Sequence, residues 1–344
     1  GNVGTTNAPN REHVTLVSVV SGNSVANVDS GFSFNVVTNL NDTGQGSLRQ
    51  FIANANAIIG ANAMRFVPAV PTNQTSGANT WWRITPTTAL PAITVTNGNN
   101  TTIDGRAYNL ADGVTQLQTN TASIGSTLSV GTGVDARVGT GDEYAMSSLN
   151  GPELEVNWAT PASSFILQAQ AASTTIQNVC LNNPTANANT AIIQVTNAAS
   201  NSIIQNNVLG SSCGNNTLDG TGSPTNASNS GIVAFENSTG VTISGNKIGN
   251  RALGLAQLTT AGAANNATIR GNEVYNDTGA SSGINLGVGT NNLGLAGASV
   301  IRDNYLWGIA GRGFVDDANS IYSFLNNTVL RGARVGATIA TTQL

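Results

Sequence analysis

Residues that could carry out chemistry are scarce in this chain of 344 residues. Charged side chains make up 9% of it, with 13 basic and 17 acidic residues and a single histidine, His13. Inverting hydrolysis of a polysaccharide needs two carboxylates about 6.5–9.5 Å apart around a water molecule. An adjacent carboxylate pair occurs at Asp316–Asp317, but no histidine accompanies it. The sequence therefore predicts no catalytic site, no metal site and no cofactor.

Lyase chemistry needs a calcium site built from acids beside an arginine or lysine base. Arg270 and Arg302 hold the same position in two copies of a repeated motif, with Glu273 and Asp303 close by in the sequence. We interpret these four residues as a solvated charged stripe with ion pairs. A polysaccharide lyase or hydrolase remains the second alternative for the function.

Two further residue pairs could be functional. Trp81 and Trp82 could stack on sugar rings, or they could pack against a cap helix or a neighbouring subunit. Cys180 and Cys213 are candidates for a structural disulfide, which would fit an oxidising, extracellular setting; two buried thiols are the alternative.

The repeated motif organises most of the chain. It consists of an aliphatic residue, two residues, a polar or small residue that is usually Asn, one residue, and a second aliphatic residue. Taking the first large apolar residue as an anchor, the anchors are Ile176, Ile204, Ile243, Ile269, Ile301 and Phe324, and a weaker copy is TIDGRAY at 102–108. Successive anchors are 28, 39, 26, 32 and 23 residues apart. A motif that returns every two to four dozen residues, with loops of different length between its copies, is typical of a solenoid.

Within each copy, apolar and polar residues alternate with the period of a strand. A second apolar segment precedes some copies, as at 192–195 and 231–235, which predicts two or three strands per coil. The recurring asparagines should form an inward ladder and supply the left-handed turn of each coil, because Asn tolerates that backbone conformation. These ladder residues are Asn207, Asn246, Asn272, Asn304 and Asn327.

The predicted fold is all-β: a right-handed parallel β-helix with an N-terminal capping α-helix and an N-terminal β-strand extension. Residues 1–37 form the extension, 38–60 the cap segment, 61–332 the β-helix, and 333–344 a C-terminal strand or tail. Within the β-helix, the Gly- and Thr-rich residues 110–150 are a long loop or an insertion. The cap helix runs from Ser47, which with Gln50 has capping-box spacing, to about Ile59, with Gly60 as its stop. Its apolar face includes Leu48, Phe51, Ile52, Ala55 and Ile59.

One capped end, one end without a helix and a spare pair of N-terminal strands suit head-to-tail assembly by strand addition. The residues that we expect at this joint are Val14, Leu16, Val17, Val19, Phe32, Phe34, Val36, Val335 and Ile339. The main expected partner is therefore another copy of this chain.

Composition excludes other partners. The chain has one lysine, Lys247, and a net charge of −4, so it lacks the basic patch that nucleic-acid binding requires. No apolar run approaches the ~20 residues of a membrane-spanning helix. We expect neither a nucleic-acid partner nor a membrane span.

A family resemblance adds to this interpretation. The segments VVTNLNDTGQGSLRQFIANANA at 36–57, ALPAIT at 89–94 and TTIDGRA at 101–107 closely resemble a family of secreted right-handed parallel β-helix proteins of bacterial and archaeal surfaces. Some members carry a CSLREA-type motif, which corresponds to GSLRQF at 46–51 here, with Gly46 in place of Cys and Gln50 in place of Glu. The resemblance implies a β-helix located outside the cell or on its surface, and it implies no particular activity.

The sequence as a whole favours a non-enzymatic extracellular structural protein that assembles head to tail into a filament, sheath or surface layer. The first alternative is a surface adhesin that binds cell-surface or matrix glycans along its flank.

Overall fold

The chain is mostly β, and the part described contains one α-helix, α1 (Leu48–Ala57). No helix among the described residues is long and apolar enough to cross a membrane. The computed structural model describes residues 20–22, 34–130, 144–158, 165–182, 191–196, 199–219, 233–235, 238–250, 255–258, 264–276, 284–288, 295–308, 314–316, 322–329 and 337–339.

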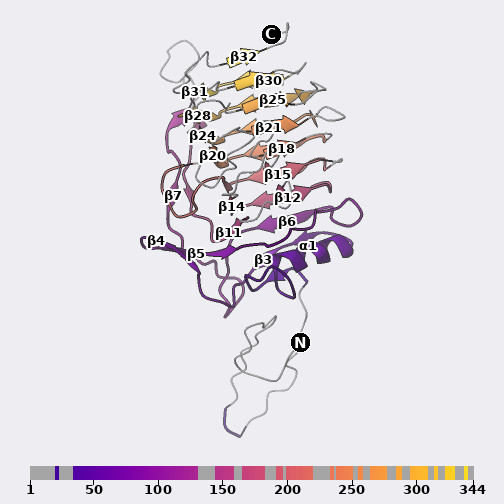
Figure 1. The fold of residues 1–344 in the computed structure, drawn as a ribbon, viewed down its shortest axis with the longest axis vertical. Helices are drawn as coiled ribbons and strands as arrows, with labels where there is room; N and C mark the ends of the chain where they lie inside the picture. The colour runs from indigo at the N-terminus through magenta and orange to yellow at the C-terminus, as the bar shows by residue number, and fades with distance from the viewer. Residues whose placement is uncertain are drawn as a thin grey trace.

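Three long sheets form the body, and their strands are parallel except for the hairpin of β4 and β5 (Figure 1). The nine-stranded sheet contains, in order, β4 (Gln74–Ser76), β5 (Asn79–Ile84), β11 (Leu154–Asn157), β14 (Val179–Asn182), β17 (Val208–Leu209), β20 (Lys247–Asn250), β24 (Glu273–Asn276), β28 (Tyr305–Trp307) and β31 (Thr328–Val329). The eight-stranded sheet contains β2 (Asn62–Ala63), β6 (Thr101–Asp104), β13 (Thr175–Gln177), β16 (Ile203–Gln205), β19 (Thr242–Ser244), β23 (Thr268–Arg270), β27 (Ser299–Arg302) and β30 (Tyr322–Leu325). The seven-stranded sheet contains β12 (Phe165–Ala169), β15 (Ala191–Val195), β18 (Val233–Phe235), β21 (Leu255–Leu258), β25 (Ile284–Val288), β29 (Phe314–Asp316) and β32 (Ala337–Ile339).

Four two-stranded sheets lie outside the three long ones. Two are parallel pairs and two are antiparallel. They consist of β1 (Val36–Val37) with β3 (Arg65–Phe66), β22 (Ala264–Asn265) with β26 (Leu295–Ala296), β7 (Ser123–Ile124) with β10 (Leu149–Asn150), and β8 (Ser129–Val130) with β9 (Tyr144–Ala145).

The chain visits the three long sheets in rotation. It passes from β13 in the eight-stranded sheet to β14 in the nine-stranded sheet and β15 in the seven-stranded sheet, and then returns to β16. The same rotation continues through β30, β31 and β32, so each turn of the chain lies on the previous one (Figure 1). Parallel neighbours therefore come from successive repeats, as the repeated motif predicts.

The motif anchors are in register across the eight-stranded sheet. Ile176 pairs with Ile204, Ile204 with Ile243, and the row continues to Phe324. The isoleucines of this row are essentially inaccessible to solvent, while Phe324 in the last strand is partly buried. Burying an aliphatic side chain of this size contributes about 1.5–3 kcal/mol, so this row is a principal component of the core.

The predicted asparagine ladder is present and fully hydrogen-bonded. Asn246 shows the pattern: its Nδ2 donates to Asn272 Oδ1 (3.0 Å) and to the carbonyl of Ile204 (2.8 Å). Its Oδ1 accepts from the backbone N–H (3.1 Å) and from Nδ2 (3.0 Å) of Asn207. The bonds continue through Asn304 to Asn327. Each amide thus connects its own turn to the neighbouring turns through hydrogen bonds.

The left-handed backbone does not belong to the ladder asparagines, contrary to our expectation. It belongs to the residue before each of them, such as Asn206 (φ 53°), Gly245 (φ 63°) and Asp303 (φ 58°). The preceding residue makes the bend between two sheets, which leaves the ladder residue free to point inward. The tolerance of Asn for this conformation therefore acts one position earlier than predicted.

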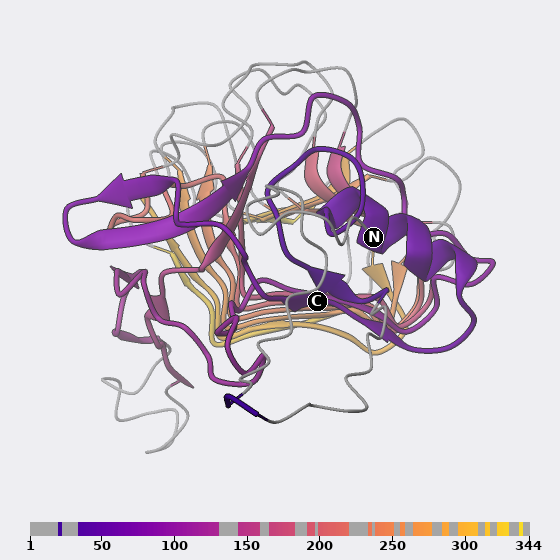
Figure 2. The same cartoon turned by 90° about the horizontal axis from the view of Figure 1, so that it is seen from below.

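Helix α1 lies across one end of the stack, as Figure 2 shows in a view from that end. Ser47 is its N-cap and accepts a hydrogen bond from the backbone N–H of Gln50 (3.1 Å). The Gln50 side chain donates to Asn54 Oδ1 (2.8 Å), so the reciprocal half of the capping box does not form. The buried residues of the helix are Leu48, Phe51, Ile52 and Ala55.

The end of the helix differs from the prediction. The helix stops at Ala57 and Ile58 is already extended, so Ile59 leaves the apolar face and is 87% exposed. Gly60 adopts a left-handed conformation (φ 109°) beyond this point.

Part of the expected N-terminal extension belongs to the body. Val36 lies in β1, which pairs with β3 of the same chain. Phe34 is 56% exposed and Ile339 lies in β32, which pairs with β29. The other residues expected at a joint lie outside the described residues: Val14, Leu16, Val17, Val19, Phe32 and Val335.

Candidate functional site

One row of side chains crosses the outer face of the nine-stranded sheet and is nonetheless buried, except for the partly exposed Arg83 at its start. Its members pair in register from strand to strand. They point away from the core, because their neighbours along each strand, such as Leu154 and Val156 beside Glu155, lie in the core. The row consists of Arg83, Glu155, Cys180, Val208, Lys247, Glu273 and Tyr305.

The expected insertion at 110–150 covers this row. We call residues 117–130 and 144–153 the arm; its two legs pair through β7 with β10 and through β8 with β9. Figure 1 shows β7 running alongside the stacked strands. The arm buries Ile124 against a cluster with Trp81 and Val208, and Val130 and Met146 against Tyr305. It therefore spans the outer face from the first turns to nearly the last.

A buried ion pair lies beneath the arm. Lys247 Nζ is 2.9 Å from Glu273 Oε2, and their side chains are 1% and 0% exposed. Glu273 also accepts from the N–H and the hydroxyl of Ser126 in the arm (both 2.7 Å) and from Trp307 Nε1 (2.8 Å). A buried carboxylate needs such partners to offset its lost hydration. Gly125 fits closely here, since a Cβ on it would lie 2.6 Å from both Glu273 Oε2 and Lys247 Cδ.

The sequence contains a signal for this pair, although we did not predict it. Lys247 and Glu273 occupy the same position in consecutive copies of the motif, TISGNKI and TIRGNEV. Residues at one motif position of successive turns become direct neighbours in a parallel stack, so opposite charges there predict an ion pair.

A second buried carboxylate, Glu155, fixes the first turns. Its Oε2 accepts from Trp81 Nε1 (2.6 Å) and Arg83 Nε (2.7 Å), and its Oε1 accepts from Asn182 Nδ2 (2.9 Å). Because its oxygens are occupied by structural partners, Glu155 has no free oxygen to offer a substrate.

The tryptophan pair is structural. Trp81 and Trp82 are 4% and 5% exposed, and Trp82 Nε1 donates to the carbonyl of Val70 (2.8 Å). Trp82 packs edge-on against Phe66, with ring centroids 5.7 Å apart, and Gly214 lies so close to the Trp81 ring that a Cβ on it would be 2.5 Å from Cζ3. Neither indole is open to a sugar ring, so the expectation of sugar stacking is wrong at this position.

Cys180 and Cys213 form a disulfide, with their Cα atoms 5.9 Å apart. It fastens the loop after β17 to the outer face of β14. The carbonyl of Cys213 also accepts from Asn120 Nδ2 of the arm (2.7 Å), which connects the loop to the arm.

The arginine stripe is smaller than expected. Arg270 Nε and Arg302 Nε both donate to Asp303 Oδ2, at 2.9 and 2.8 Å, and the two arginine side chains are 46% and 41% exposed. Burial alone would raise the pKa of Asp303, but hydrogen bonds from Asn326 and the two arginines outweigh it and hold the pKa below its usual value. Glu273 belongs to the buried pair instead. The stripe therefore consists of two partly exposed arginines that share one buried aspartate.

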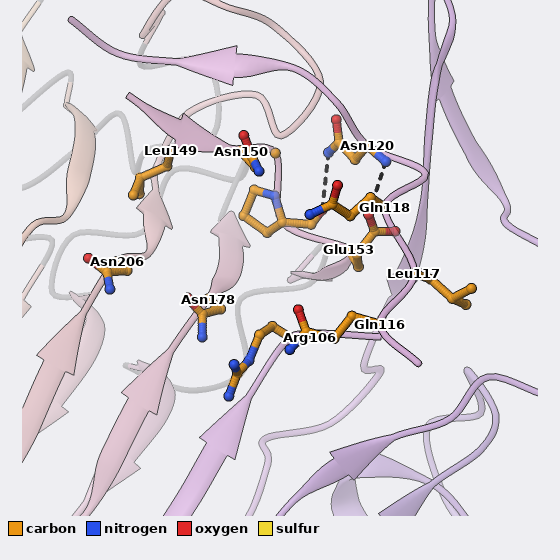
Figure 3. Close-up of a pocket in the computed structure, with 12 residues that line it drawn as sticks. Arg106, Gln116, Leu117, Gln118, Asn120, Leu149, Asn150, Glu153, Asn178 and Asn206 are labelled. Atoms are coloured by element: carbon orange, nitrogen blue, oxygen red, sulfur yellow. Dashed lines mark hydrogen bonds between the residues drawn. The ribbon is translucent and has the colours of Figure 1, made fainter. Parts of the chain in front are cut away.

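A polar groove opens beside the arm (Figure 3). It has a volume of about 300 Å³ and lies between the two legs of the arm and the bend that leads from the eight-stranded to the nine-stranded sheet. Its lining residues are Arg106, Gln116, Leu117, Gln118, Asn120, Leu149, Asn150, Gly151, Pro152, Glu153, Asn178 and Asn206.

Two charged residues of this groove, Arg106 and Glu153, form hydrogen bonds with other groups of the protein. Arg106 Nε contacts Asp104 Oδ2 (2.9 Å), and Asp104 also accepts from Asn178 Nδ2 (3.0 Å). Glu153 Oε1 accepts from the backbone N–H groups of Thr119 (2.7 Å) and Asn120 (3.0 Å). Burial raises the pKa of Glu153 above its ordinary value, and these hydrogen bonds offset the rise only in part.

The described residues contain no group of three or more His, Cys, Asp or Glu side chains placed to hold a metal ion. Asp316 lies in β29, while Asp317 and His13 lie outside the described residues. No protein-family model matches the sequence.

Proposed function

We propose that this chain is a non-enzymatic structural protein of the extracellular space or cell surface: a right-handed parallel β-helix that assembles head to tail into a filament, sheath or surface layer. The observation that carries the proposal is that the two ends of the stack differ. Among the described residues, α1 covers one end of the stack, and β30, β31 and β32 are the last strands of their sheets at the other end.

The rotation of the chain through three parallel sheets supports the β-helix. Successive turns place one strand in each sheet, and the asparagine ladder marks the same corner in five consecutive turns, from Asn207 to Asn327. Parallel connections between strands are right-handed in nearly all proteins, which gives the proposed hand.

The helix-capped end carries exposed apolar side chains. Phe34, Ile59 and Val95 are 56%, 87% and 53% exposed. They lie around α1, since Asn54 of the helix donates to the carbonyl of Phe34 (3.1 Å) and Asn97 donates to that of Asn56 (3.3 Å). Exposed apolar residues gathered at one end suit contact with another protein surface.

The opposite end is formed by β30, β31 and β32, the last strands of their sheets. Leu325 in β30 is 51% exposed, and Val329 in β31 is partly buried, whereas its neighbour Leu306 in the preceding turn is fully buried. A terminal strand is a template for pairing with another chain. Residues 13–33 of the next copy, which include the first of the two predicted N-terminal strands, are the proposed occupant.

The extracellular setting is supported by the Cys180–Cys213 disulfide, because such bonds persist mainly in oxidising compartments. It is also supported by the resemblance of residues 36–107 to secreted β-helix proteins.

Sedimentation velocity of the full chain and of designed variants tests the assembly. Deleting residues 1–33 leaves β1 intact and should give folded monomers, with unchanged circular dichroism. Leu325→Lys should also abolish polymers, because it places a charge at the terminal edge. Leu128→Lys is the matched control, since Leu128 is 50% exposed but lies on the arm, and it should polymerise like the parent chain. Polymers formed by the deleted chain, or equal behaviour of the two lysine variants, would refute this joint.

A further inference from the structure

The groove beside the arm has hydrogen-bonding groups that the protein does not use. Its exposed amide side chains point into the opening from three directions (Figure 3). Within the part of the chain that the structure describes, the groove amides that form no side-chain hydrogen bond are those of Gln116, Gln118, Asn150 and Asn206. An amide offers two donors and an acceptor with two lone pairs, so the groove presents both kinds of group at once.

The walls of the groove are fixed before any ligand arrives. Asn120 Nδ2 joins the two legs of the arm by donating to the carbonyl of Pro152 (3.0 Å). Gly151 N–H donates to the carbonyl of Ala122 (2.7 Å), and Asn120 lies so close to Gly151 that a Cβ there would meet its side chain at 2.2 Å. A site with prearranged walls loses little conformational entropy when it binds.

The charged groups of the groove already have partners within the protein. Arg106 is paired with Asp104, and the carboxylate of Glu153 is occupied by backbone N–H groups of the arm. Phosphates and other anions bind to unpaired arginine or lysine side chains. The residues described around the groove include no such side chain. The ligand chemistry that remains is uncharged and rich in both donors and acceptors.

A peptide strand fits this groove less well than a sugar. Peptides recognised along their backbone add to an open strand edge, but the backbone here is already paired, with Asn150 bonded to Ser123 and Gly151 to Ala122. Asn178 and Asn206 lie in the bends that follow β13 and β16, two neighbouring strands about 4.8 Å apart. That spacing is close to the length of one pyranose unit in an extended glycan, and Leu149, which is partly buried, supplies apolar surface beside it.

We infer that this groove binds a neutral oligosaccharide, with amide side chains of the arm and of the turn corners contacting its hydroxyl groups. The site is separate from the proposed end-to-end joint, so either one can fail without the other.

Isothermal titration calorimetry tests the inference. The sample is the chain lacking residues 1–33 if that chain is folded and monomeric, and the full chain if it is not. The probes are the hexasaccharides of β-1,4-glucose, α-1,4-glucose, β-1,4-xylose, β-1,4-mannose and N-acetylglucosamine, with an Asn/Thr-rich hexapeptide beside them. At least one sugar should bind. Gln118→Ala and Asn150→Ala should each weaken it about five-fold, as expected for the loss of one or two hydrogen bonds. Gln74→Ala, in the β4–β5 hairpin outside the groove, is the matched control and should leave binding unchanged.

Three outcomes would overturn the inference. The first is no binding of any of the five sugars at millimolar concentration. The second is binding of the hexapeptide in place of the sugars. The third is sugar binding that is equally strong in Gln118→Ala, Asn150→Ala and the control Gln74→Ala. That result would place the binding site outside the groove.

Discussion

Replacing Lys247 by methionine should lower the free energy of unfolding more than most other substitutions on the outer face of the nine-stranded sheet. Methionine keeps most of the length and apolar surface of the side chain but removes the only cation within hydrogen-bonding distance of Glu273 among the described residues. The Glu273 side chain is 0% exposed, so water cannot replace the ammonium group. Breaking a buried pair in this way costs about 3–5 kcal/mol, because an uncompensated charge remains inside.

Urea unfolding at neutral pH, followed by circular dichroism, measures this loss. Arg302→Met is the matched control: it also exchanges a cation for methionine, but the Arg302 side chain is 41% exposed and Asp303 keeps Arg270 as a partner. We expect the control to cost at most about 1 kcal/mol. Hydrogen exchange of peptides within 117–130 and 144–153 should rise in Lys247→Met alone, because the ion pair lies directly beneath the arm.

A double variant separates the charge from the packing. Adding Glu273→Gln to Lys247→Met removes the orphaned charge, so the double variant should be more stable than Lys247→Met alone. The reasoning is refuted if Lys247→Met costs no more than Arg302→Met, or if Glu273→Gln destabilises the double variant further.

Three other predictions concern the stack itself. Cys213→Ser should lower the free energy of unfolding by about 2–4 kcal/mol, whereas a reducing agent should leave this variant unaffected and destabilise the parent chain by a similar amount. Asn246→Ala should cost at least about 3 kcal/mol in urea unfolding, since it leaves the buried backbone N–H of Asn207 without a partner and removes the bonds that Nδ2 donates to Asn272 Oδ1 and to the carbonyl of Ile204. Burial of Asp104 would raise its pKa, but hydrogen bonds from Arg106, Asn178 and Gln177 outweigh it and hold the pKa below the ordinary 3.8. The stability that this carboxylate contributes is therefore full above that value and is lost as pH falls through the lower folded-state pKa. Acid titration of unfolding stability should show a smaller loss below about pH 4 in Asp104→Asn than in the parent chain; an equal loss would contradict the assignment.

The sequence predicted the stacking because the motif carries its register explicitly. Ile204 and Ile243 are separated by 39 residues and Ile301 and Phe324 by 23, yet each pair is in register, since loops absorb the difference. The inward asparagines were equally predictable. An amide buried at a recurring position of the motif can form hydrogen bonds only with the same amide in neighbouring turns and with the backbone. The helix start was predictable from Ser47.

The arm was beyond sequence reasoning for a physical reason. Its strands are two residues long and antiparallel, and they gain their burial from side chains on a distant face of the stack. The pattern of apolar and polar residues within a segment does not predict a contact with a distant face of the stack. The same long-range packing buries Trp81, whose neighbour Gly214 is brought over it by the disulfide-linked loop. The groove is likewise built from residues far apart in the chain, such as Arg106 and Asn150.

Fibre diffraction from oriented assemblies of the full chain tests the central claim most directly. If copies stack end to end, every strand lies across the filament and the sheets continue along it. The spacing of hydrogen-bonded strands, about 4.7–4.9 Å, must then appear as a reflection along the filament axis. Filaments with that reflection on the axis, lost in the Leu325→Lys variant, are the predicted result. A chain that forms no ordered assembly, or filaments whose strand reflection lies perpendicular to the axis, would contradict head-to-tail stacking.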